Sequence, residues 1–225
     1  MKNKKFAVIG LGRFGSAIAR KLSQRGAEVL AIDINQDRVE SLKDDVAYAV
    51  CLDSTDAKNL EAQSIEEMDA VVVAIGTNFQ DLILTTFALM ELDVERIIVR
   101  AQDPIQKRIL EKIGVKEILS LEDEVSNNVA EQLLNPSVLM SIRLPDDYEI
   151  IEVRAPRIIC NRTLGDIGLR EKYSINLITV MRKGNLDGKF HILGVPDAST
   201  KITEDDIIVV FGRSNDIDRF LEINQ

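Results

Sequence analysis

Short apolar runs recur along the first half of the chain, separated by longer stretches in which apolar and polar residues follow a helical period. Six such runs, rich in β-branched residues, predict strands at residues 6–10, 28–33, 47–53, 70–76, 96–101 and 117–121. Runs that are apolar throughout, and not only at every second position, are typical of parallel strands with both faces covered. The pattern therefore predicts an α/β fold with a doubly wound parallel sheet.

The second half of the chain repeats this alternation on a smaller scale. A helix is predicted at 122–134 and a polar turn at 143–149. The pattern then predicts strands at 150–156, 176–184, 189–194 and 205–212, and helices at 163–174 and 215–223. This order indicates a second, smaller α/β domain. We place the boundary between about 135 and 148, and assign residues 1–135 to the first domain and 136–225 to the second.

The composition of the chain excludes some classes of binding partner and some cellular settings. The 37 acidic and 28 basic residues give a net charge of −9, which repels polyanions, and no local basic patch is present, so we expect no nucleic-acid binding. Cys51 and Cys160 lie far apart without a metal-binding spacing, as is typical of a reducing, cytoplasmic setting. No apolar run approaches the roughly 20 residues of a spanning helix. We therefore expect no direct membrane insertion, and any membrane role through a partner.

A glycine-rich loop follows the first predicted strand. Gly10, Gly12 and Gly15 fit the pattern GxGxxG at the opening of a helix, and Asp33 ends the second strand 18 residues after Gly15. In a Rossmann-like sheet the first glycine permits a sharp turn, the second lets a phosphate approach the backbone, and the third lets helix and strand pack closely. The acid accepts hydrogen bonds from ribose hydroxyls. The spacing predicts a nucleotide site.

Two charged residues of this site bear on which nucleotide binds. The carboxylate of Asp33 would repel a 2′-phosphate, which disfavours NADP relative to NAD, ATP or ADP. Arg13 lies between the glycines at the helix entrance, where its guanidinium can reach a terminal phosphate. A site that reads the number of phosphates gains from such a cation. Arg13 therefore favours sensing over hydride transfer, although a solvated arginine at a helix end is the simpler alternative.

Other strand ends point at the same crevice, because ligands of doubly wound sheets bind outside the carboxyl ends of the strands. Asp53 and Ser54 follow the third strand, Ile75 and Gly76 end the fourth, Arg100 ends the fifth and Glu122 follows the sixth. Glu122 can hold a divalent cation that bridges phosphate oxygens, since hard cations take carboxylate ligands. Its alternative role is that of an acid at a helix N-terminus.

Catalytic constellations are absent from the sequence. The single histidine, His191, falls in a predicted strand of the small domain without an obvious orienting partner, and no GxSxG or cysteine nucleophile pattern occurs. We therefore expect a binding protein and not an enzyme. Two alternatives stay open, a small NAD-dependent oxidoreductase and an NAD(H)-binding regulator, because Asp33 serves NAD as well as ATP.

The segment "FAVIGLGRFGSAIARKL", followed by "VLAID", "CLDSTD", "VVVAIG", "IIVRAQD" and "LREKYSINLITVMR", resembles a known family. It is similar to the KtrA/TrkA-type cytosolic regulatory subunits of bacterial potassium uptake systems, which are built from RCK N- and C-terminal domains. The resemblance covers nearly the whole chain. It implies a homo-octameric ring at the inner face of the cell membrane, beneath a potassium channel or transporter that ATP and ADP regulate through the ring.

The resemblance also implies roles for single residues. Gly12, Arg13 and Gly15 would hold phosphates, Asp33 the ribose, and Arg100 the phosphate side, with Mg²⁺ or Ca²⁺ at Glu122. The base would lie against Asp53 to Thr55 and against Ile75 and Gly76. With the adjoining residues of the two loops, the candidate set is Gly10, Gly12, Arg13, Phe14, Gly15, Asp33, Ile34, Asp53, Ser54, Thr55, Ile75, Gly76, Arg100 and Glu122. Position 53 departs from the family, in which a neutral asparagine or a glycine–aspartate pair is frequent.

The C-terminal domain resembles a module that in some relatives binds cyclic di-AMP between two subunits. Arg170 would pair with a phosphate and Asn176 would read an adenine edge, beside the apolar Leu177 and Ile178. An exposed helix arginine and a strand-capping asparagine are the alternatives. The predicted helices at 79–92 and 123–134 are candidate subunit contacts, or plain core.

Overall fold

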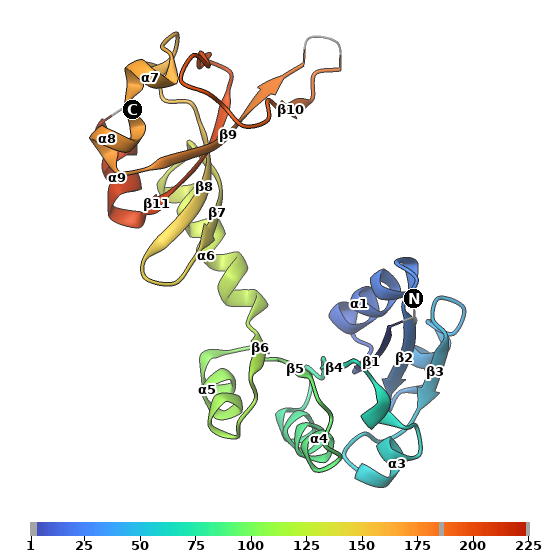
Figure 1. Ribbon diagram of the computed structural model, residues 1–225. Helices are drawn as coiled ribbons and strands as arrows, with labels where there is room; N and C mark the ends of the chain where they lie inside the picture. Colours follow the sequence, from blue (N-terminus) through green and yellow to red (C-terminus); the bar gives the residue numbers. More distant parts are fainter. Residues whose placement is uncertain (1–3, 185–186, 224–225) are drawn as a thin grey trace. The chain divides into compact units, whose positions relative to one another are not determined.

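The computed structural model describes residues 4–184 and 187–223 (Figure 1). The chain divides into two compact units, Met1–Glu124 and Val125–Gln225. The division falls inside helix α6 (Leu121–Leu134), earlier than the interval in which the sequence places the domain boundary. The assignment of residues 1–135 and 136–225 to two domains stays a proposal.

The first unit is built on a sheet of six parallel strands, in the order β3-β2-β1-β4-β5-β6. All six predicted strands are present, and the predicted doubly wound sheet is confirmed. The order reverses between β1 and β4, which is where ligands bind in folds of this kind. The strands are β1 (Lys5–Ile9), β2 (Glu28–Asp33), β3 (Tyr48–Cys51), β4 (Ala70–Val73), β5 (Ile97–Arg100) and β6 (Glu117–Leu119).

Helices cover both faces of this sheet, so alternate strand residues enter two separate cores. On one face Val8, Val29 and Ala31 are buried with Ala19 and Val39, which come from α1 and α2. The opposite face buries a larger core under α3, α4 and α5. The helices are α1 (Arg13–Gln24), α2 (Gln36–Glu40), α3 (Ala57–Glu61), α4 (Phe79–Glu91) and α5 (Pro104–Lys112), with a 3-10 turn at Ile65–Glu67.

Short polar side chains start several of these helices. Asn35, Asp56, Asn78 and Asp103 each accept a hydrogen bond from a backbone N–H two residues further on, which is the usual N-cap arrangement. Each of the four follows a strand of the sheet by two to five residues. The caps therefore fix where the chain turns from strand to helix at the end of the sheet that carries the candidate site.

The second unit holds an antiparallel sheet of five strands, in the order β10-β9-β11-β8-β7. Its buried face includes Val153, Val180 and Val210 from three strands, packed on Ile217 and Phe220. The elements are β7 (Val138–Arg143), β8 (Tyr148–Arg154), a 3-10 turn (Arg157–Ile159), α7 (Leu164–Ile167), α8 (Leu169–Tyr173), β9 (Asn176–Lys183), β10 (Phe190–Ile192), β11 (Ile207–Arg213) and α9 (Ser214–Ile223).

Two features of this unit correct the sequence prediction. Strand β7 was not predicted, because its exposed Met140 and Ile142 break the apolar-in, polar-out alternation that marks a strand with one buried face. The predicted helix at 163–174 is interrupted at Gly168, whose φ of +64° lies in the left-handed region and separates α7 from α8. Among the described residues, no helix combines the length and the apolar character needed to cross a membrane.

Candidate nucleotide-binding site

The glycine loop joins β1 to α1 at the point where the strand order reverses. Gly10 has a φ of +91°, and a Cβ there would lie 2.8 Å from the backbone of Ala74 and Ile75, at the end of β4. At Gly15 a Cβ would lie 1.9 Å from the carbonyl oxygen of Gly10. Only glycine fits at these two positions, and their lack of side chains lets α1 approach the end of the sheet.

Gly12 meets a different environment. It is the N-cap of α1, has no side chain to cap the helix, and a Cβ there would find no protein atom within 4 Å. The first N–H groups of a helix lack intrahelical acceptors, and with the helix dipole they attract anions. No acidic residue lies in the first turn of α1. The open space beside Gly12 therefore suits a phosphate group.

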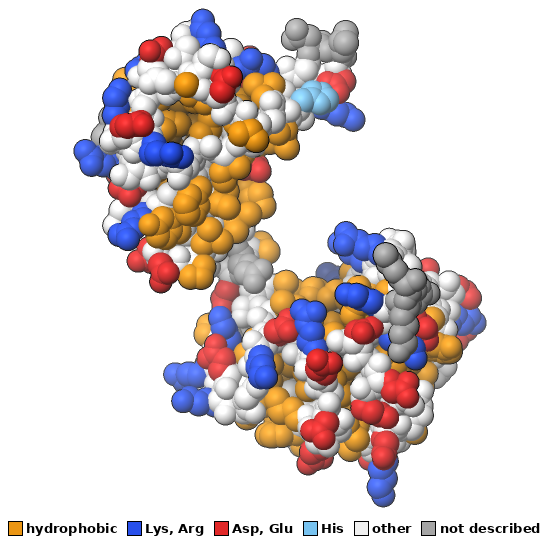
Figure 2. Space-filling view, viewed as in Figure 1, with side chains coloured by type: hydrophobic (Ala, Val, Ile, Leu, Met, Phe, Trp, Pro, Cys, Tyr) orange, Lys and Arg blue, Asp and Glu red, His pale blue; other side chains and the backbone are white. Residues whose placement is uncertain are grey.

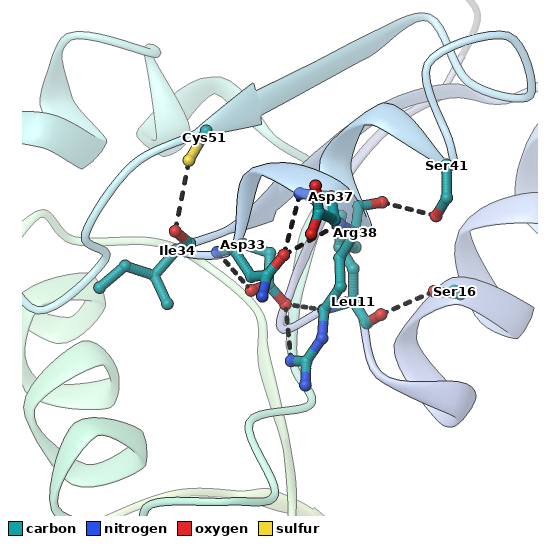
Figure 3. Close-up of polar contacts among 9 residues, drawn as sticks. Leu11, Ser16, Asp33, Ile34, Asp37, Arg38, Ser41 and Cys51 are labelled. Atoms are coloured by element: carbon teal, nitrogen blue, oxygen red, sulfur yellow. Dashed lines mark hydrogen bonds and ion pairs between the residues drawn. The ribbon is translucent and has the colours of Figure 1, made fainter.

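Asp33 ties the end of β2 to the glycine loop (Figure 3). Its side chain is buried, with Oδ2 accepting the backbone N–H of Leu11 at 2.6 Å and Oδ1 accepting that of Asn35 at 2.8 Å. The guanidinium of Arg38, in α2, donates to Oδ2 at 3.3 Å. The carboxylate is thus held in place by backbone donors before any ribose arrives, with one longer contact, that from Arg38, available for exchange.

Arg38 is a site residue that sequence reasoning missed. It lies five positions after Asp33, within the first turns of α2, and its side chain faces the same hollow. Ile34, between them in sequence, is largely exposed beside the hollow, and its carbonyl oxygen accepts a hydrogen bond from the thiol of Cys51 (Figure 3). No spacing in the sequence signals this contact, because Asp33 ends β2 whereas Arg38 lies in α2.

The loop after β3 is organised by its own acid. Asp53 Oδ1 accepts both the backbone N–H of Thr55 at 2.9 Å and its hydroxyl at 2.7 Å. The hydroxyl bond and then the backbone bond lower the pKa of Asp53, so its carboxylate is ionised at neutral pH. Ser54 points the other way and shares a hydrogen bond of 2.8 Å with Thr85 of α4. This contact anchors the loop to the core.

The residues at the ends of β4 and β5 form the other side of the candidate nucleotide site. A Cβ on Gly76 would lie 2.9 Å from Gln102 Nε2, so this glycine leaves room for a polar side chain from the next strand. The Arg100 guanidinium stands 5.5 Å from the centre of the Phe14 ring and forms an ion pair with Glu122. The hydrogen bond from its own backbone N–H and then the bond from Arg100 lower the pKa of Glu122 against the opposing effect of burial.

Most of the candidate residues line one hollow at the carboxyl end of the sheet. Arg13 also lines it, is exposed, and within the described part of the chain has neither an ion-pair nor a hydrogen-bond partner. Gly15 and Glu122 are candidate residues that do not line the hollow. The lining residues are Ile9, Gly10, Gly12, Arg13, Phe14, Asp33, Ile34, Arg38, Asp53, Ser54, Thr55, Ala74, Ile75, Gly76, Thr77, Asp81, Arg100 and Gln102.

Metal-ligating side chains are sparse around Glu122 in the described part of the chain. Among the described residues no group of three His, Cys, Asp or Glu side chains is close enough to hold a metal ion. Glu122 is a single carboxylate, and Arg100 already donates to it.

The second unit has a hollow of its own. Arg170, Asn176 and Leu177 line it together with Ile175 and residues 196–198, whereas Ile178 lies outside the lining. Arg170 Nε donates to Asn176 Oδ1 at 2.8 Å, so the two predicted polar residues contact each other. The sequence expectation for His191 was wrong in one respect, because its Nε2 pairs with Asp187 Oδ2 at 3.0 Å. His191 lines neither hollow.

The strand order, the glycine loop and the acid at the end of β2 define a Rossmann-like nucleotide-binding fold, followed by a second domain with an antiparallel sheet. The family model of the TrkA-N domain matches residues 6–121, and that of the TrkA-C domain matches residues 148–225. The chain therefore belongs to the TrkA-N/TrkA-C family, and the resemblance stated from the sequence is confirmed.

Individual relatives agree with this assignment. The chain is 38% identical over 217 residues to Ktr system potassium uptake protein C of Bacillus subtilis, covering 96% of each chain. It is 37% identical over 220 residues to Ktr system potassium uptake protein A of the same organism, covering 98% of this chain and 96% of that one. A solved structure, the GsuK RCK domain, shares the fold at a TM-score of 0.67 and 16% identity, with 99% of this chain and 48% of that chain covered.

Proposed function

We propose that this protein is a nucleotide-sensing regulatory subunit, without catalytic activity of its own, that gates a membrane-embedded potassium uptake channel or transporter. The observation that carries the proposal is the Arg13 guanidinium at the entrance of α1, which has no ion-pair or hydrogen-bond partner among the described residues and lies beside the open space at Gly12. A protein that responds to the number of phosphates needs a contact that only the longer ligand reaches. The two Ktr relatives, named as potassium uptake proteins, supply the transport role.

ATP and ADP are the proposed ligands. Asp33, held by the N–H groups of Leu11 and Asn35, offers its carboxylate to the ribose, and the space beside Gly12 receives the phosphates. Arg13 then approaches the terminal phosphate of ATP. NAD(H) is the competing ligand, because the same carboxylate and glycine loop serve a dinucleotide. Only Arg13, whose guanidinium has no partner among the described residues and lies at the entrance of α1, favours ATP and ADP over NAD(H).

A divalent cation, Mg²⁺ or Ca²⁺, is proposed as a companion of the nucleotide. Glu122 would contribute one carboxylate oxygen and the phosphates the others, which fits the preference of hard cations for oxygen ligands. Its function would be to neutralise charge where phosphate and carboxylate meet.

The hollow in the second unit supports a second ligand. Arg170 and Asn176 bring a guanidinium and an amide together in a hollow that Leu177 and Ile175 also line, which suits a phosphate joined to an adenine. Cyclic di-AMP has both groups, and we propose it as the ligand of this site.

The regulator is proposed to act at the inner face of the cell membrane, in the cytoplasm, as a homo-octameric ring on its membrane partner. The test is rubidium uptake by the natural host after deletion of the gene for this chain. We expect uptake to fall and to return with the wild-type gene but not with a Gly12→Ala variant. Uptake that is unchanged by the deletion would contradict the proposed role in potassium transport.

A further inference from the structure

Arg100 lines the nucleotide hollow, and its positive charge is already paired with the carboxylate of Glu122. It ends β5, its side chain is only 18% exposed, and its guanidinium lies over the Phe14 ring. One terminal nitrogen donates to Glu122, whereas Nε is buried without a hydrogen-bond partner among the described residues. The guanidinium of Arg100 therefore lies at the hollow with only some of its N–H donors in hydrogen bonds.

Glu122 is the weaker-held member of the pair. Its side chain is 52% exposed and projects from the first turn of α6. A phosphate group presents several oxygens and a larger charge to the same guanidinium, and arginine binds such groups through two parallel hydrogen bonds. Because Arg100 is retained by Phe14 and Glu122 faces solvent, an incoming phosphate would displace the carboxylate and not the arginine.

We propose that the Arg100–Glu122 ion pair is a latch that the phosphates of a bound nucleotide open. This inference rests on the proposed nucleotide function and adds a mechanism of regulation to it. When a phosphate takes the guanidinium and no divalent cation bridges that phosphate to Glu122, the carboxylate loses its partner and the first turn of α6 is released. In the absence of nucleotide, the pair holds that turn to the end of β5.

The place of Glu122 in the chain gives the latch its consequence. Helix α6 runs from Leu121 to Leu134, and the division between the two units falls after Glu124, within the same helix. Releasing the first turn of α6 therefore changes the start of the segment that links the units. The phosphate of the nucleotide and the carboxylate of Glu122 compete for the guanidinium of Arg100. Through this competition, the binding of a nucleotide in the hollow affects helix α6.

The same two strands carry a matched control. Arg96 immediately precedes β5 and Glu117 begins β6, at the ends of these strands opposite the nucleotide hollow. Their side chains form a two-bond ion pair, with Arg96 Nε and Nη2 each donating to a carboxylate oxygen at 2.7 Å. Neither residue lines the nucleotide hollow. Glu117→Gln thus removes another arginine–glutamate ion pair without touching the latch.

The test is calorimetric titration of ATP into the full chain, with EDTA present so that no cation contributes. Glu122→Gln is expected to bind ATP about two- to fivefold more tightly than wild type, the range of an exposed ion pair no longer competing, whereas Glu117→Gln matches wild type. Unchanged or weaker binding by Glu122→Gln would overturn the latch alone. A wild-type chain that binds no nucleotide would overturn the proposed function, and the latch with it.

Amide hydrogen exchange on the wild-type chain gives a second readout that does not depend on how the variant folds. ATP in EDTA is expected to speed exchange of the amides at 125–128, whose helical hydrogen bonds reach the carbonyls of the first turn of α6, while adenosine, which has no phosphate, leaves it unchanged. Exchange there that ATP slows or leaves unaltered would refute the release of this turn.

Discussion

Gly12, the N-cap of α1, and Gly15, in the first turn of that helix, have opposite surroundings. A methyl group at Gly15 would meet the Gly10 carbonyl oxygen at 1.9 Å, whereas at Gly12 it would enter open space from an ordinary extended backbone, with φ −69° and ψ −171°. Gly15→Ala is therefore expected to destabilise the chain by about 1–3 kcal/mol. Gly12→Ala is expected to stay within about 0.5 kcal/mol of wild type and to weaken ATP binding about tenfold.

Urea unfolding and calorimetric titration of the two variants separate these effects. The contrast between the two variants is the useful quantity, because both replace a glycine by alanine at the start of α1. A Gly12→Ala variant that binds ATP as well as wild type does would show that no phosphate lies beside Gly12.

Arg13 is the residue that we propose distinguishes ATP from ADP, by contacting the terminal phosphate of ATP. Its guanidinium is unpaired in the described part of the chain, so removing it breaks no internal contact. Arg13→Ala is expected to weaken ATP binding about tenfold, the value of a charge-assisted hydrogen bond, and to change ADP binding little. Arg25→Ala, at the other end of α1, is the control. Equal losses for ATP and ADP would remove Arg13 from the discrimination.

At the scale of elements, one buried acid fastens the loop before β11 to β9. Asp206 is 1% exposed and accepts hydrogen bonds from Arg182 Nε and Nη2, at 2.8 and 2.6 Å, and from the Thr203 N–H at 2.7 Å. Burial alone would raise the pKa of Asp206, but the bonds from Arg182 and Thr203 outweigh it and the pKa is lowered. The carboxylate therefore stabilises the fold only while it is ionised.

The sign of the pH effect follows from this lowered pKa. The contribution is complete above the ordinary aspartate pKa of about 4, and it is lost as pH falls through the lower pKa of the folded state. Asp206→Asn is expected to be less stable than wild type by about 1–3 kcal/mol at pH 7, and the difference should shrink below about pH 4. Urea unfolding from pH 7 to 3 measures it, with the exposed Asp205→Asn as control. A difference that does not depend on pH would contradict this role.

Elements whose physical cause is local were predictable from the sequence. The six parallel strands are continuous apolar runs, and Asp103 followed by Pro104 marks the start of α5, as the structure shows. Strand β7 was missed because its outward face carries Met140 and Ile142, and the break at Gly168 because glycine inside a helical pattern does not reveal its φ. The Arg38–Asp33 and Arg100–Glu122 contacts depend on how side chains from separate elements meet, which no spacing rule reports.

At the scale of the whole molecule, exposed apolar side chains on α6 form the surface that we propose for contact between copies of the chain. Val125, Val129 and Leu133 follow one another at four-residue intervals along α6, and each is nearly half exposed or more, at 62%, 47% and 76%. Figure 2 shows hydrophobic side chains gathered on one face of the smaller unit. Apolar stripes of this kind are characteristic of interaction surfaces. The proposed ring gives them a partner, a second copy of the chain.

Val129→Glu is expected to reduce the molar mass of the assembly measured by light scattering, because it places a charge in the middle of this stripe. Asn127→Glu adds the same charge at an exposed polar position of the same helix and is expected to leave the mass unchanged. If the Val129→Glu variant keeps the wild-type mass, α6 is not the contact between copies.

The central claim is that the hollow at the carboxyl end of the parallel sheet reads the number of phosphates on an adenine nucleotide. The most direct measurement is calorimetric titration of ATP, ADP and NADH into the purified wild-type chain, with Mg²⁺ present. We predict that ATP binds about tenfold more tightly than ADP, and that both bind more tightly than NADH. Tighter binding of NADH than of either mononucleotide would show that the site is built for a dinucleotide.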